Sequence, residues 1–327
     1  MTDKDLKIVF FGTPEFAVES LEALLAEGCR VEAVVTMPDK KGGRGNRVIE
    51  SAVKKCARAH GLPLLQPEKL SDPEFLAQLR SYDADLFIVI AFRMLPRAVW
   101  QMPPMGTFNL HGSLLPRYRG AAPINRAIMN GETTTGVTTF MLRHELDTGD
   151  ILQQEAIEIG EDENLGSVYD RLMKIGARLT VETVRHIAAG DLRPMPQDEL
   201  TKDIEPVPAP KIFHEDCHID WNQPAELIHN QVRGLSPVPG AWTELTLAGE
   251  QGAPESTVKI LATTRRDCDG TLRPGELESR GKAVVVGTGT SVLKLITVQP
   301  AGKKAMDAAD WFRGLRKGEN GREPWLR

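Results

Sequence analysis

In the first half of the chain, short apolar runs alternate with longer stretches in which apolar residues recur every three or four positions. Short apolar runs typical of buried strands occupy residues 7–12, 31–37, 62–66, 85–92 and 107–111. Stretches with apolar residues every three or four positions, typical of helices, begin at Pro14 and cover residues 48–60, 73–82, 122–130 and 164–189. Strands that alternate with helices predict a parallel sheet covered on both faces.

The pattern changes after two further strand-like runs at 135–142 and 151–159 and the long helix that follows them. Five prolines fall between residues 190 and 210, in a stretch otherwise rich in charged residues, as in an interdomain linker. Beyond it, β-like runs separated by glycine-rich turns, GTGT at 287–290 among them, favour a small barrel. We expect a first domain at 1–190, a linker at 191–209 and a second domain at 210–327.

Length and composition agree with two globular domains. The chain has 327 residues, of which 41% are hydrophobic and 26% charged, and its net charge of -5 argues against wholesale coating of nucleic acid. Its four cysteines are widely spaced, and no apolar stretch approaches the ~18 residues needed to span a bilayer. We expect a cytoplasmic monomer with free thiols and no membrane association.

The first candidate site lies where the strand at 107–111 ends. On a strand, Asn109 and His111 point to the same side, so both can reach one reacting group. A carboxamide can donate to a developing oxyanion and an imidazole can move a proton, a combination suited to acyl transfer. An Asn in a turn beside a half-buried histidine is the alternative.

A second candidate lies in the turn LDTGD, residues 146–150. The carboxylate of Asp147 could orient an imidazole and stabilise its charge. Asp, Thr and Gly are also common turn residues, which leaves a purely structural role open.

Two cofactor classes find little support. The segment after the first strand lacks the G-x-G-x-x-G spacing of dinucleotide-binding folds, which argues against a nicotinamide cofactor. His214, Cys217 and His218 form an H-x-x-C-H cluster, but no second ligand pair follows at the spacing of a structural zinc site. We therefore expect no metal.

Basic residues gather in two places. Residues 37–58 contain seven basic and two acidic side chains around three glycines, as in a flexible loop that grips phosphates, although a solvated surface loop has the same composition. Residues 210–327 carry a net charge of +1, and the tail from Lys303 carries seven basic against four acidic residues. This asymmetry favours a polyanionic partner for the second domain.

Five segments together resemble the methionyl-tRNA formyltransferases. They are FFGTPEFAVESLEALL, TMPDKKGGRG, FNLHGSLLPRYRGAAPINRAIMNGETTTGVT, LDTGDIL and VQPAGKKAM, in family order from near residue 7 to beyond residue 306. The resemblance implies a Rossmann-like formyltransferase domain followed by a small OB-like β-barrel. It further implies transfer of the formyl group of 10-formyltetrahydrofolate to the amino group of initiator methionyl-tRNA, for translation initiation.

The resemblance also implies roles for individual residues. Asn109, His111 and Asp147 match the family's catalytic residues. The folate-binding S-L-L-P segment corresponds to Ser113, Leu114, Leu115 and Pro116. Arg44 matches the arginine of the loop that enters the tRNA acceptor end, and the further tRNA-binding candidates are Lys40, Lys41, Arg47, Lys211, Lys303 and Lys304.

Two stretches depart from the family pattern. Residues 142–145 read LRHE where many members have MDEG, and residues 91–93 read AFR where many have AYG, which alters the walls near the folate site.

The choice of acceptor has alternatives. The same catalytic residues would serve a formyltransferase acting on a sugar amine or glycinamide ribonucleotide, or a formyltetrahydrofolate hydrolase. An RNA-binding protein with an inactive α/β half is a further alternative. The basic loop and the second domain favour tRNA.

Overall fold

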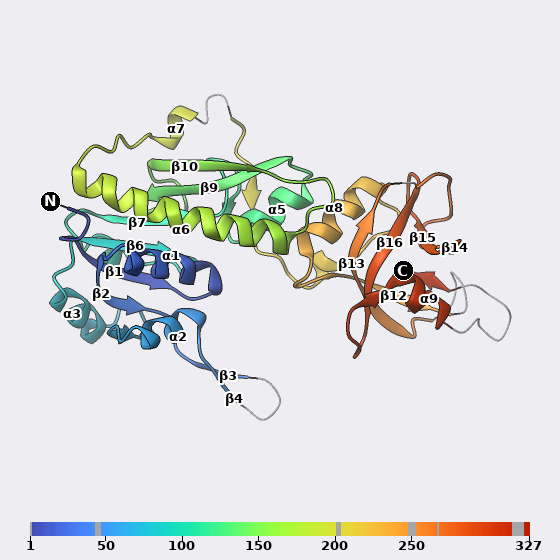
Figure 1. Cartoon of the computed structure of the whole chain (residues 1–327), viewed down its shortest axis with the longest axis horizontal. Coiled ribbons are helices and arrows are strands. Elements are labelled where there is room, and N and C mark those ends of the chain that lie inside the picture. The colour runs from blue at the N-terminus through green and yellow to red at the C-terminus, as the bar shows by residue number, and fades with distance from the viewer. Residues whose placement is uncertain (1, 43–46, 201–203, 248–252, 267, 316–323) are drawn as a thin grey trace. The chain divides into compact units, whose positions relative to one another are not determined.

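The structure, a computed structural model, describes residues 2–42, 47–200, 204–247, 253–266, 268–315 and 324–327, with elements labelled in Figure 1. Contacts within the chain define two compact units. The first comprises residues 1–123, 136–157 and 169–209, and the second comprises 124–135, 158–168 and 210–327. Each unit has its own seven-stranded sheet.

The strands and helices expected from the sequence occur in the predicted order through residue 209, with several short elements between them that were not predicted. In chain order they are β1 (Lys7–Gly12), α1 (Glu15–Ala26), β2 (Arg30–Val35), β3 (Lys40–Gly42), β4 (Arg47–Ile49), α2 (Ala52–Ala59), β5 (Leu64–Leu65), α3 (Pro73–Ser81), β6 (Leu86–Ile90), α4 (Arg97–Trp100), β7 (Thr107–His111), β8 (Arg119–Gly120), α5 (Pro123–Met129), β9 (Thr134–Met141), β10 (Ile151–Glu158), α6 (Leu165–Ala189), α7 (Gln197–Leu200) and β11 (Pro208–Ala209). The strands predicted at 7–12 and 107–111 are confirmed at both ends.

The sheet of the first unit has the strand order β10-β9-β7-β6-β1-β2-β5. β7, β6, β1, β2 and β5 run parallel, as predicted, whereas β9 is antiparallel to β7. Next to β9 at the edge of the sheet lies β10, whose side chains beyond the first two residues are partly or fully exposed. An antiparallel edge tolerates one wet face, whereas a parallel sheet needs both faces covered.

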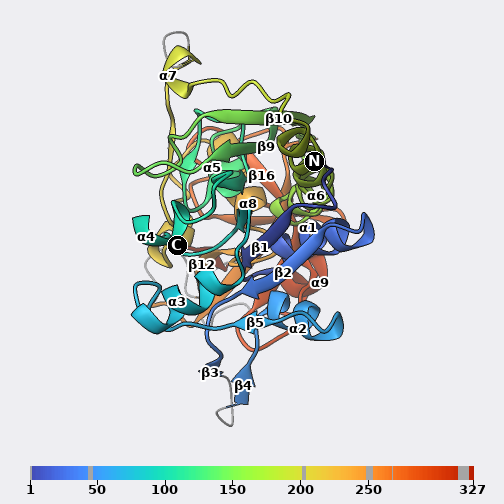
Figure 2. The same cartoon turned by 90° about the vertical axis from the view of Figure 1, so that its left-hand side faces the viewer.

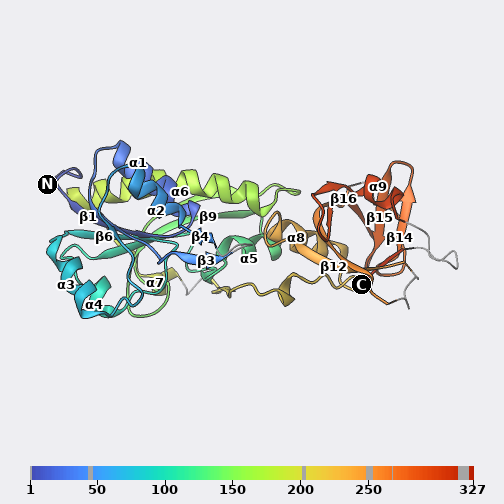
Figure 3. The same cartoon turned by 90° about the horizontal axis from the view of Figure 1, so that it is seen from below.

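Helices cover both faces of this sheet. Figure 3 shows α1, α2 and α6 on one side of the strands and α3 and α4 on the other. The core under α3 and α4 takes alternate residues of β1, β2 and β6, including Val9, Phe11 and Phe87. These layers bring the carboxyl ends of β1, β6 and β7 together at one edge, where ligands bind in open α/β sheets.

The helix predicted at 48–60 begins four residues later than expected. Ser51 caps α2 by accepting a hydrogen bond from the Lys54 backbone N–H at 3.0 Å, which fixes the start of the helix at Ala52. Val48 and Ile49 instead belong to β4, which pairs with β3 in a hairpin. Figure 2 shows this hairpin extending away from the sheet.

The proline-rich segment 191–209 contains regular structure of its own. It includes the short helix α7, and β11 pairs in parallel with β8. Met195 forms an antiparallel bridge with Ile151, through two backbone hydrogen bonds of 2.8 Å. The segment therefore packs within the first unit on both sides of α7.

An antiparallel sheet forms the second unit. Its elements after residue 210 are η1 (Glu215–Cys217), α8 (Ala225–Leu235), β12 (Ala241–Thr246), β13 (Ser256–Thr264), β14 (Leu277–Arg280), β15 (Ala283–Gly287), β16 (Val292–Pro300), β17 (Met306–Asp307), α9 (Ala308–Arg313) and β18 (Trp325–Leu326). The sheet order is β14-β15-β16-β13-β12-β18, with β17 beside β16. The GTGT segment makes the predicted turn between β15 and β16.

The two edge strands of this sheet meet. Glu276 and Trp325 form an antiparallel bridge, and the Leu326 N–H donates to the Gly275 carbonyl at 2.9 Å. A Cβ at position 275 would lie 2.0 Å from the Leu326 carbonyl oxygen, so this approach requires glycine. The closure agrees with the predicted small barrel. Within the described residues, no helix is long and apolar enough to cross a bilayer.

Candidate active site

Three adjacent strands bring unpaired polar atoms to the same edge of the first sheet. Thr13 follows β1, Arg93 follows β6 by three residues, and Asn109 lies on β7. Among the described residues, Thr13 Oγ1, Arg93 Nε and Asn109 Oδ1 are buried atoms without a hydrogen-bond partner. Because buried polar atoms are nearly always paired, such a cluster indicates a ligand-binding edge.

His111 is 6% exposed and lies at the end of β7. Its Nε2 is 2.8 Å from the Tyr118 carbonyl oxygen. A carbonyl only accepts, so Nε2 carries the hydrogen and Nδ1 of the neutral ring holds a lone pair. That Nδ1 lies 3.8 Å from Asp147 Oδ2, so a proton arriving on Nδ1 would be stabilised by the carboxylate.

Asp147, 7% exposed, is held in the turn between β9 and β10. Its Oδ2 accepts a hydrogen bond from the Gly120 backbone N–H at 3.0 Å. Its φ of 54° lies in the left-handed region, which is uncommon for a residue with a side chain. The structure thus brings Asp147 together with His111, and Asn109 lies two residues away on the same strand.

The S-L-L-P segment is held rigidly after β7. Ser113 Oγ donates to the Arg117 carbonyl at 2.8 Å, and Thr138 Oγ1 donates to the Ser113 carbonyl at 2.6 Å. The Leu115 N–H donates to Thr138 Oγ1 at 3.1 Å. Ser113, Leu115 and Pro116 are buried, whereas Leu114 is partly exposed. The hydroxyl of Ser113 is committed to the loop itself, which leaves Leu114 as the accessible side chain of the segment.

Each of the two departures from the family pattern contains an arginine with contacts inside the protein. Arg93 donates to the backbone carbonyls of Pro67 and Glu68, and its guanidinium lies 5.7 Å from the centroid of the Phe92 ring. Arg143 forms a 2.6 Å ion pair with Asp150. Both arginines are thus held by contacts within the protein.

The basic loop of the first unit divides into described and undescribed parts. Arg44 lies outside the described residues, and so do the side chains of Lys41 and Arg47. Lys40 is exposed on β3. On β4 the side chains of Val48 and Ile49 are 60% and 55% exposed.

Two other cations of this region have carboxylate partners. Lys54 pairs with Asp39 at 2.6 Å and with Glu50 at 3.2 Å, and Arg58 pairs with Glu50 at 2.9 Å. Lys54 and Arg58 thus add little positive potential to the hairpin.

The basic candidates of the second unit are exposed. Lys303 and Lys304 lie in the turn between β16 and β17, and Lys211 places its ammonium 5.4 Å from the centroid of the Phe213 ring. Among the residues that the structure describes, no carboxylate pairs with these three lysines. Their charges remain available to a polyanion.

The H-x-x-C-H cluster packs as an aromatic group. The rings of His214 and His218 lie 4.8 and 4.5 Å from the Trp242 ring, and Cys217 Sγ donates to the Phe213 carbonyl. These contacts give both imidazoles and the thiol a packing role.

A different trio, Glu22, Cys56 and His60, has ligating atoms within 4.8 Å of one another. The Cys56 thiol donates to Glu22 Oε1 at 3.2 Å, and His60 Nε2 lies 2.8 Å from Glu22 Oε2. Burial, together with the Glu22 carboxylate, raises the pKa of the Cys56 thiol to about 12. The three groups satisfy one another as an interhelical hydrogen-bond network.

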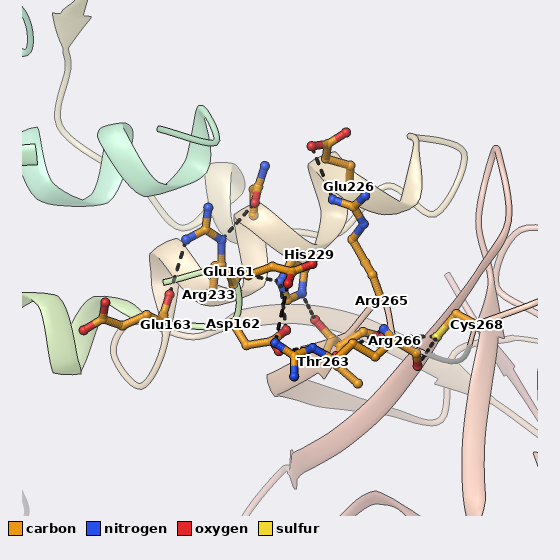
Figure 4. Close-up of polar contacts among 12 residues, drawn as sticks. Glu161, Asp162, Glu163, Glu226, His229, Arg233, Thr263, Arg265, Arg266 and Cys268 are labelled. Atoms are coloured by element: carbon orange, nitrogen blue, oxygen red, sulfur yellow. Dashed lines mark hydrogen bonds and ion pairs between the residues drawn. The ribbon is translucent and has the colours of Figure 1, made fainter. Parts of the chain in front are cut away.

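The buried histidine of the second unit anchors the segment between β10 and α6 (Figure 4). His229 Nε2 donates to the Glu161 carbonyl at 3.2 Å, and its Nδ1 lies 2.9 Å from Thr263 Oγ1. Burial lowers the pKa of His229, and the nearby Arg233 and Arg265 act in the same direction, whereas the hydrogen bond to the Glu161 carbonyl and the Asp162 carboxylate oppose them. The neutral ring is therefore the form that fits this site.

Sequence reasoning missed Gln197, which contacts the Asp147 turn directly. It is 1% exposed, and its Nε2 donates to the carbonyl oxygens of Asp147 and Gly149 at 3.0 and 2.7 Å. No local pattern marks it, because it lies in a polar, proline-rich segment fifty residues from its partners. A glutamine beside a predicted catalytic turn becomes visible only when the chain is folded.

Comparison with known proteins gives consistent matches along the chain. The formyl transferase family profile matches residues 6–184, and the profile of the formyl transferase C-terminal domain matches residues 211–316. The methionyl-tRNA formyltransferase of Bacteroides fragilis is 48% identical over 316 residues, covering 96% of this chain and 97% of the relative. That of Parabacteroides distasonis is 50% identical over 320 residues, covering 97% and 98%.

Solved structures of lower identity share the fold. HypX from Aquifex aeolicus, in complex with tetrahydrofolic acid, is 20% identical with a TM-score of 0.62, over 97% of this chain and 48% of HypX. This chain thus spans about half the length of HypX. WlaRD, a sugar 3N-formyl transferase, is 19% identical with a TM-score of 0.62, over 91% and 99% of the two chains. On the family profiles and the full-length relatives, the chain belongs to the methionyl-tRNA formyltransferase family.

Proposed function

We propose that this enzyme transfers the formyl group of 10-formyltetrahydrofolate to the amino group of initiator methionyl-tRNA, with Asn109, His111 and Asp147 as catalytic residues. The observation that carries the proposal is the approach of His111 Nδ1 to Asp147 Oδ2 at 3.8 Å, two residues along β7 from Asn109, whose buried Oδ1 has no hydrogen-bond partner. The proposal is also supported by the two formyl transferase family profiles, one of which matches the first part of the chain and one the second.

We assign removal of the proton of the attacking amine to His111. The amine attacks the formyl carbon, the new C–N bond forms, and the bond from the formyl carbon to the folate nitrogen breaks. The attacking amine must lose a proton, and the lone pair on Nδ1 can receive it because Nε2 is engaged by Tyr118. Asp147 then stabilises the imidazolium, and the same proton can pass to the departing folate nitrogen.

Asn109 is suited to the oxygen of the formyl group. Rotation about its terminal torsion exchanges the amide oxygen and nitrogen, so its N–H can point at the same space as its unpaired oxygen. Negative charge develops on the formyl oxygen during attack, and a positioned amide donor typically contributes ~10²–10³-fold in rate. The chemistry assigned to these three residues requires no metal.

Folate would bind along the catalytic edge of the sheet. The rigid segment Ser113, Leu114, Leu115 and Pro116 forms one wall, with the side chain of Leu114 accessible to the ligand. HypX, which shares the fold, was solved with tetrahydrofolic acid, and this supports a folate pocket in the same fold.

The tRNA would contact exposed basic residues of both units. In the first, the candidates are Lys40 and Lys41 on β3, Arg47 on β4, and Arg44, which lies outside the described residues; exposed Val48 and Ile49 add apolar surface on β4. In the second, they are Lys211, Lys303 and Lys304. Under this proposal residues 1–190 form the domain that transfers the formyl group, residues 191–209 link the two domains, and residues 210–327 form the domain that binds tRNA. An acceptor taken from translation supports a cytoplasmic location, and we further propose that the enzyme acts as a monomer.

The proposal is tested by formyl transfer from 10-formyltetrahydrofolate to charged initiator methionyl-tRNA, with uncharged tRNA and free methionine as controls. We expect product only with the charged tRNA, and a loss of about 10²–10⁴-fold in turnover for Asp147→Asn. Formyl appearing on a sugar amine, on glycinamide ribonucleotide or in water instead would retain the folate chemistry and overturn the acceptor.

A further inference from the structure

Gln197 lies in the segment between the two predicted domains, yet its amide is enclosed by the catalytic loops of the first unit. Its two N–H groups donate to the carbonyl oxygens of Asp147 and Gly149. Its Oε1 accepts from Arg119, at 3.1 Å from Nε and 2.7 Å from the terminal nitrogen NH2. The amide thus has both donors and both lone pairs engaged.

The orientation of this amide follows from its partners. Two carbonyl oxygens only accept and a guanidinium only donates, so the flipped amide would lose every bond. Arg119 itself belongs to β8, next to Gly120, whose N–H holds Asp147 Oδ2. Gln197 therefore links the backbone of the Asp147 turn to the strand that binds the Asp147 carboxylate.

The Asp147 turn needs such support. Asp147 has a φ of 54°, a conformation that residues with side chains seldom adopt. A Cβ at position 149 would lie 1.5 Å from the Met141 carbonyl oxygen, so the turn is pressed against β9. The strained backbone and the close approach mean that other contacts must hold the carboxylate opposite His111.

The chain on both sides of Gln197 is fixed to the same loops. Met195 pairs with Ile151, just after the Asp147 turn, and β11 pairs with β8. The Tyr118 N–H donates to the Val207 carbonyl at 2.6 Å, and the Tyr118 carbonyl is the partner of His111. Segment 195–209 therefore contacts the neighbours of both members of the proposed proton-handling pair.

We propose that Gln197, held by Arg119, is a positioning residue that sets the Asp147 carboxylate against His111 for formyl transfer. This inference rests on the proposed catalytic role of Asp147. A displacement of about 1 Å at a reacting group can cost about 10²-fold in rate, so one buried amide can matter as much as a group that touches substrate.

The test uses full-length Gln197→Glu. An ionised carboxylate keeps the size of the side chain and its pairing with Arg119, but it cannot donate to the two carbonyls and repels them. We expect kcat to fall about 10²-fold, while KM for charged tRNA and for 10-formyltetrahydrofolate stays within about twofold. Gln197→Met, which is uncharged and of similar length, should show the same separation of kcat from KM.

Gln101→Glu is the matched control. Gln101 also accepts from an arginine, Arg97 Nε at 2.8 Å, but it is exposed and lies at the end of α4, before β7 begins. We expect wild-type kcat for this variant. Thermal unfolding of all variants separates a positioning effect from loss of the fold.

A double-mutant cycle with Asp147→Asn decides the mechanism. If Gln197 acts through Asp147, Gln197→Glu should lower kcat by less than about twofold in the Asp147→Asn background. A full further loss there, a rise in KM that accounts for the loss, or wild-type kcat in both Gln197 variants would overturn the inference. Wild-type turnover of Asp147→Asn alone would instead overturn the proposed function, so the two failures are distinguishable.

Discussion

The proposed catalytic edge of the first sheet and the proposed tRNA-binding lysines differ in how far the protein itself fixes their geometry. His111 and Asp147 are both more than nine-tenths buried, and each is held by a backbone partner. Lys40, Lys303 and Lys304 are exposed, with no carboxylate partner among the described residues. Proton transfer needs atoms at defined distances, whereas attraction to phosphate needs only charge within the screening length. The first region should govern turnover and the second affinity.

Among the variants that compare the two regions, the largest effect is expected when the amide of the proposed catalytic residue Asn109 is removed. Asn109→Ala should lower kcat by about 10²-fold or more, because the formyl oxygen loses its donor. The binding constant for 10-formyltetrahydrofolate, measured by fluorescence titration, should change little. Near-normal turnover would remove Asn109 from the mechanism.

Arg44→Ala should have the opposite effect on the two substrates. We expect weaker use of tRNA and unchanged binding of 10-formyltetrahydrofolate. An equal loss of both would contradict the assignment of Arg44 to the tRNA.

A smaller effect is expected where two exposed cations are removed together. Lys303→Ala combined with Lys304→Ala should raise KM for tRNA several-fold and leave kcat unchanged. If each lysine contacts one phosphate, the slope of log KM against log salt should decrease by about 1.5. Lys282→Ala, an exposed lysine in the turn between β14 and β15, is the control. An unchanged salt slope in the double variant would place these lysines away from the RNA.

Acid stability tests a buried group outside both regions. The folded state lowers the pKa of His229 below its ordinary value near 6.5, so the unfolded chain binds the proton first as the pH falls. The free energy of unfolding should therefore decrease as the pH falls below about 6.5. Urea unfolding at pH 8 and pH 5 should show a smaller decrease for His229→Gln than for the wild type. His186→Gln, which changes an exposed histidine, should show the same decrease in the free energy of unfolding as the wild type. An equal decrease for all three proteins would contradict the lowered pKa of His229.

Thiol reactivity gives the smallest expected difference. Burial raises the pKa of Cys29, Cys56 and Cys217, so few thiolates form at neutral pH, whereas Cys268 is partly exposed. We expect a maleimide to label Cys268 first and the other three only on unfolding, as read by mass spectrometry of the peptides. Rapid labelling of Cys56 in the native protein would show that the α1–α2 contact opens.

Local patterns predicted the parts of the fold that local physics determines. The strands at 7–12 and 107–111 were confirmed to the residue because a short apolar run bounded by polar residues specifies a buried strand. Asn109 and His111 could be proposed because the end of such a strand is a known place for ligands. The hairpin at 40–49 was missed because Val48 and Ile49, apolar yet exposed, read as the start of a helix.

Contacts between distant segments could not be predicted. Gln197 reaches Asp147 across fifty positions, and the proline-rich composition around it predicts a linker rather than a part of the site. The tautomer of His111 depends on the Tyr118 carbonyl, whose direction follows from the folded loop. Closure of the barrel through Glu276 and Trp325 likewise depends on a pairing across about fifty residues.

The most direct test of the difference between the two regions is a single-turnover titration with charged initiator tRNA at saturating 10-formyltetrahydrofolate. Asn109→Ala should lower the plateau rate by about 10²-fold with the half-saturating tRNA concentration unchanged. The double variant of Lys303 and Lys304 should do the reverse, keeping the plateau and raising the half-saturating concentration. A lower plateau for the lysine variant, or a shifted half-saturation without a lower plateau for Asn109→Ala, would contradict the account.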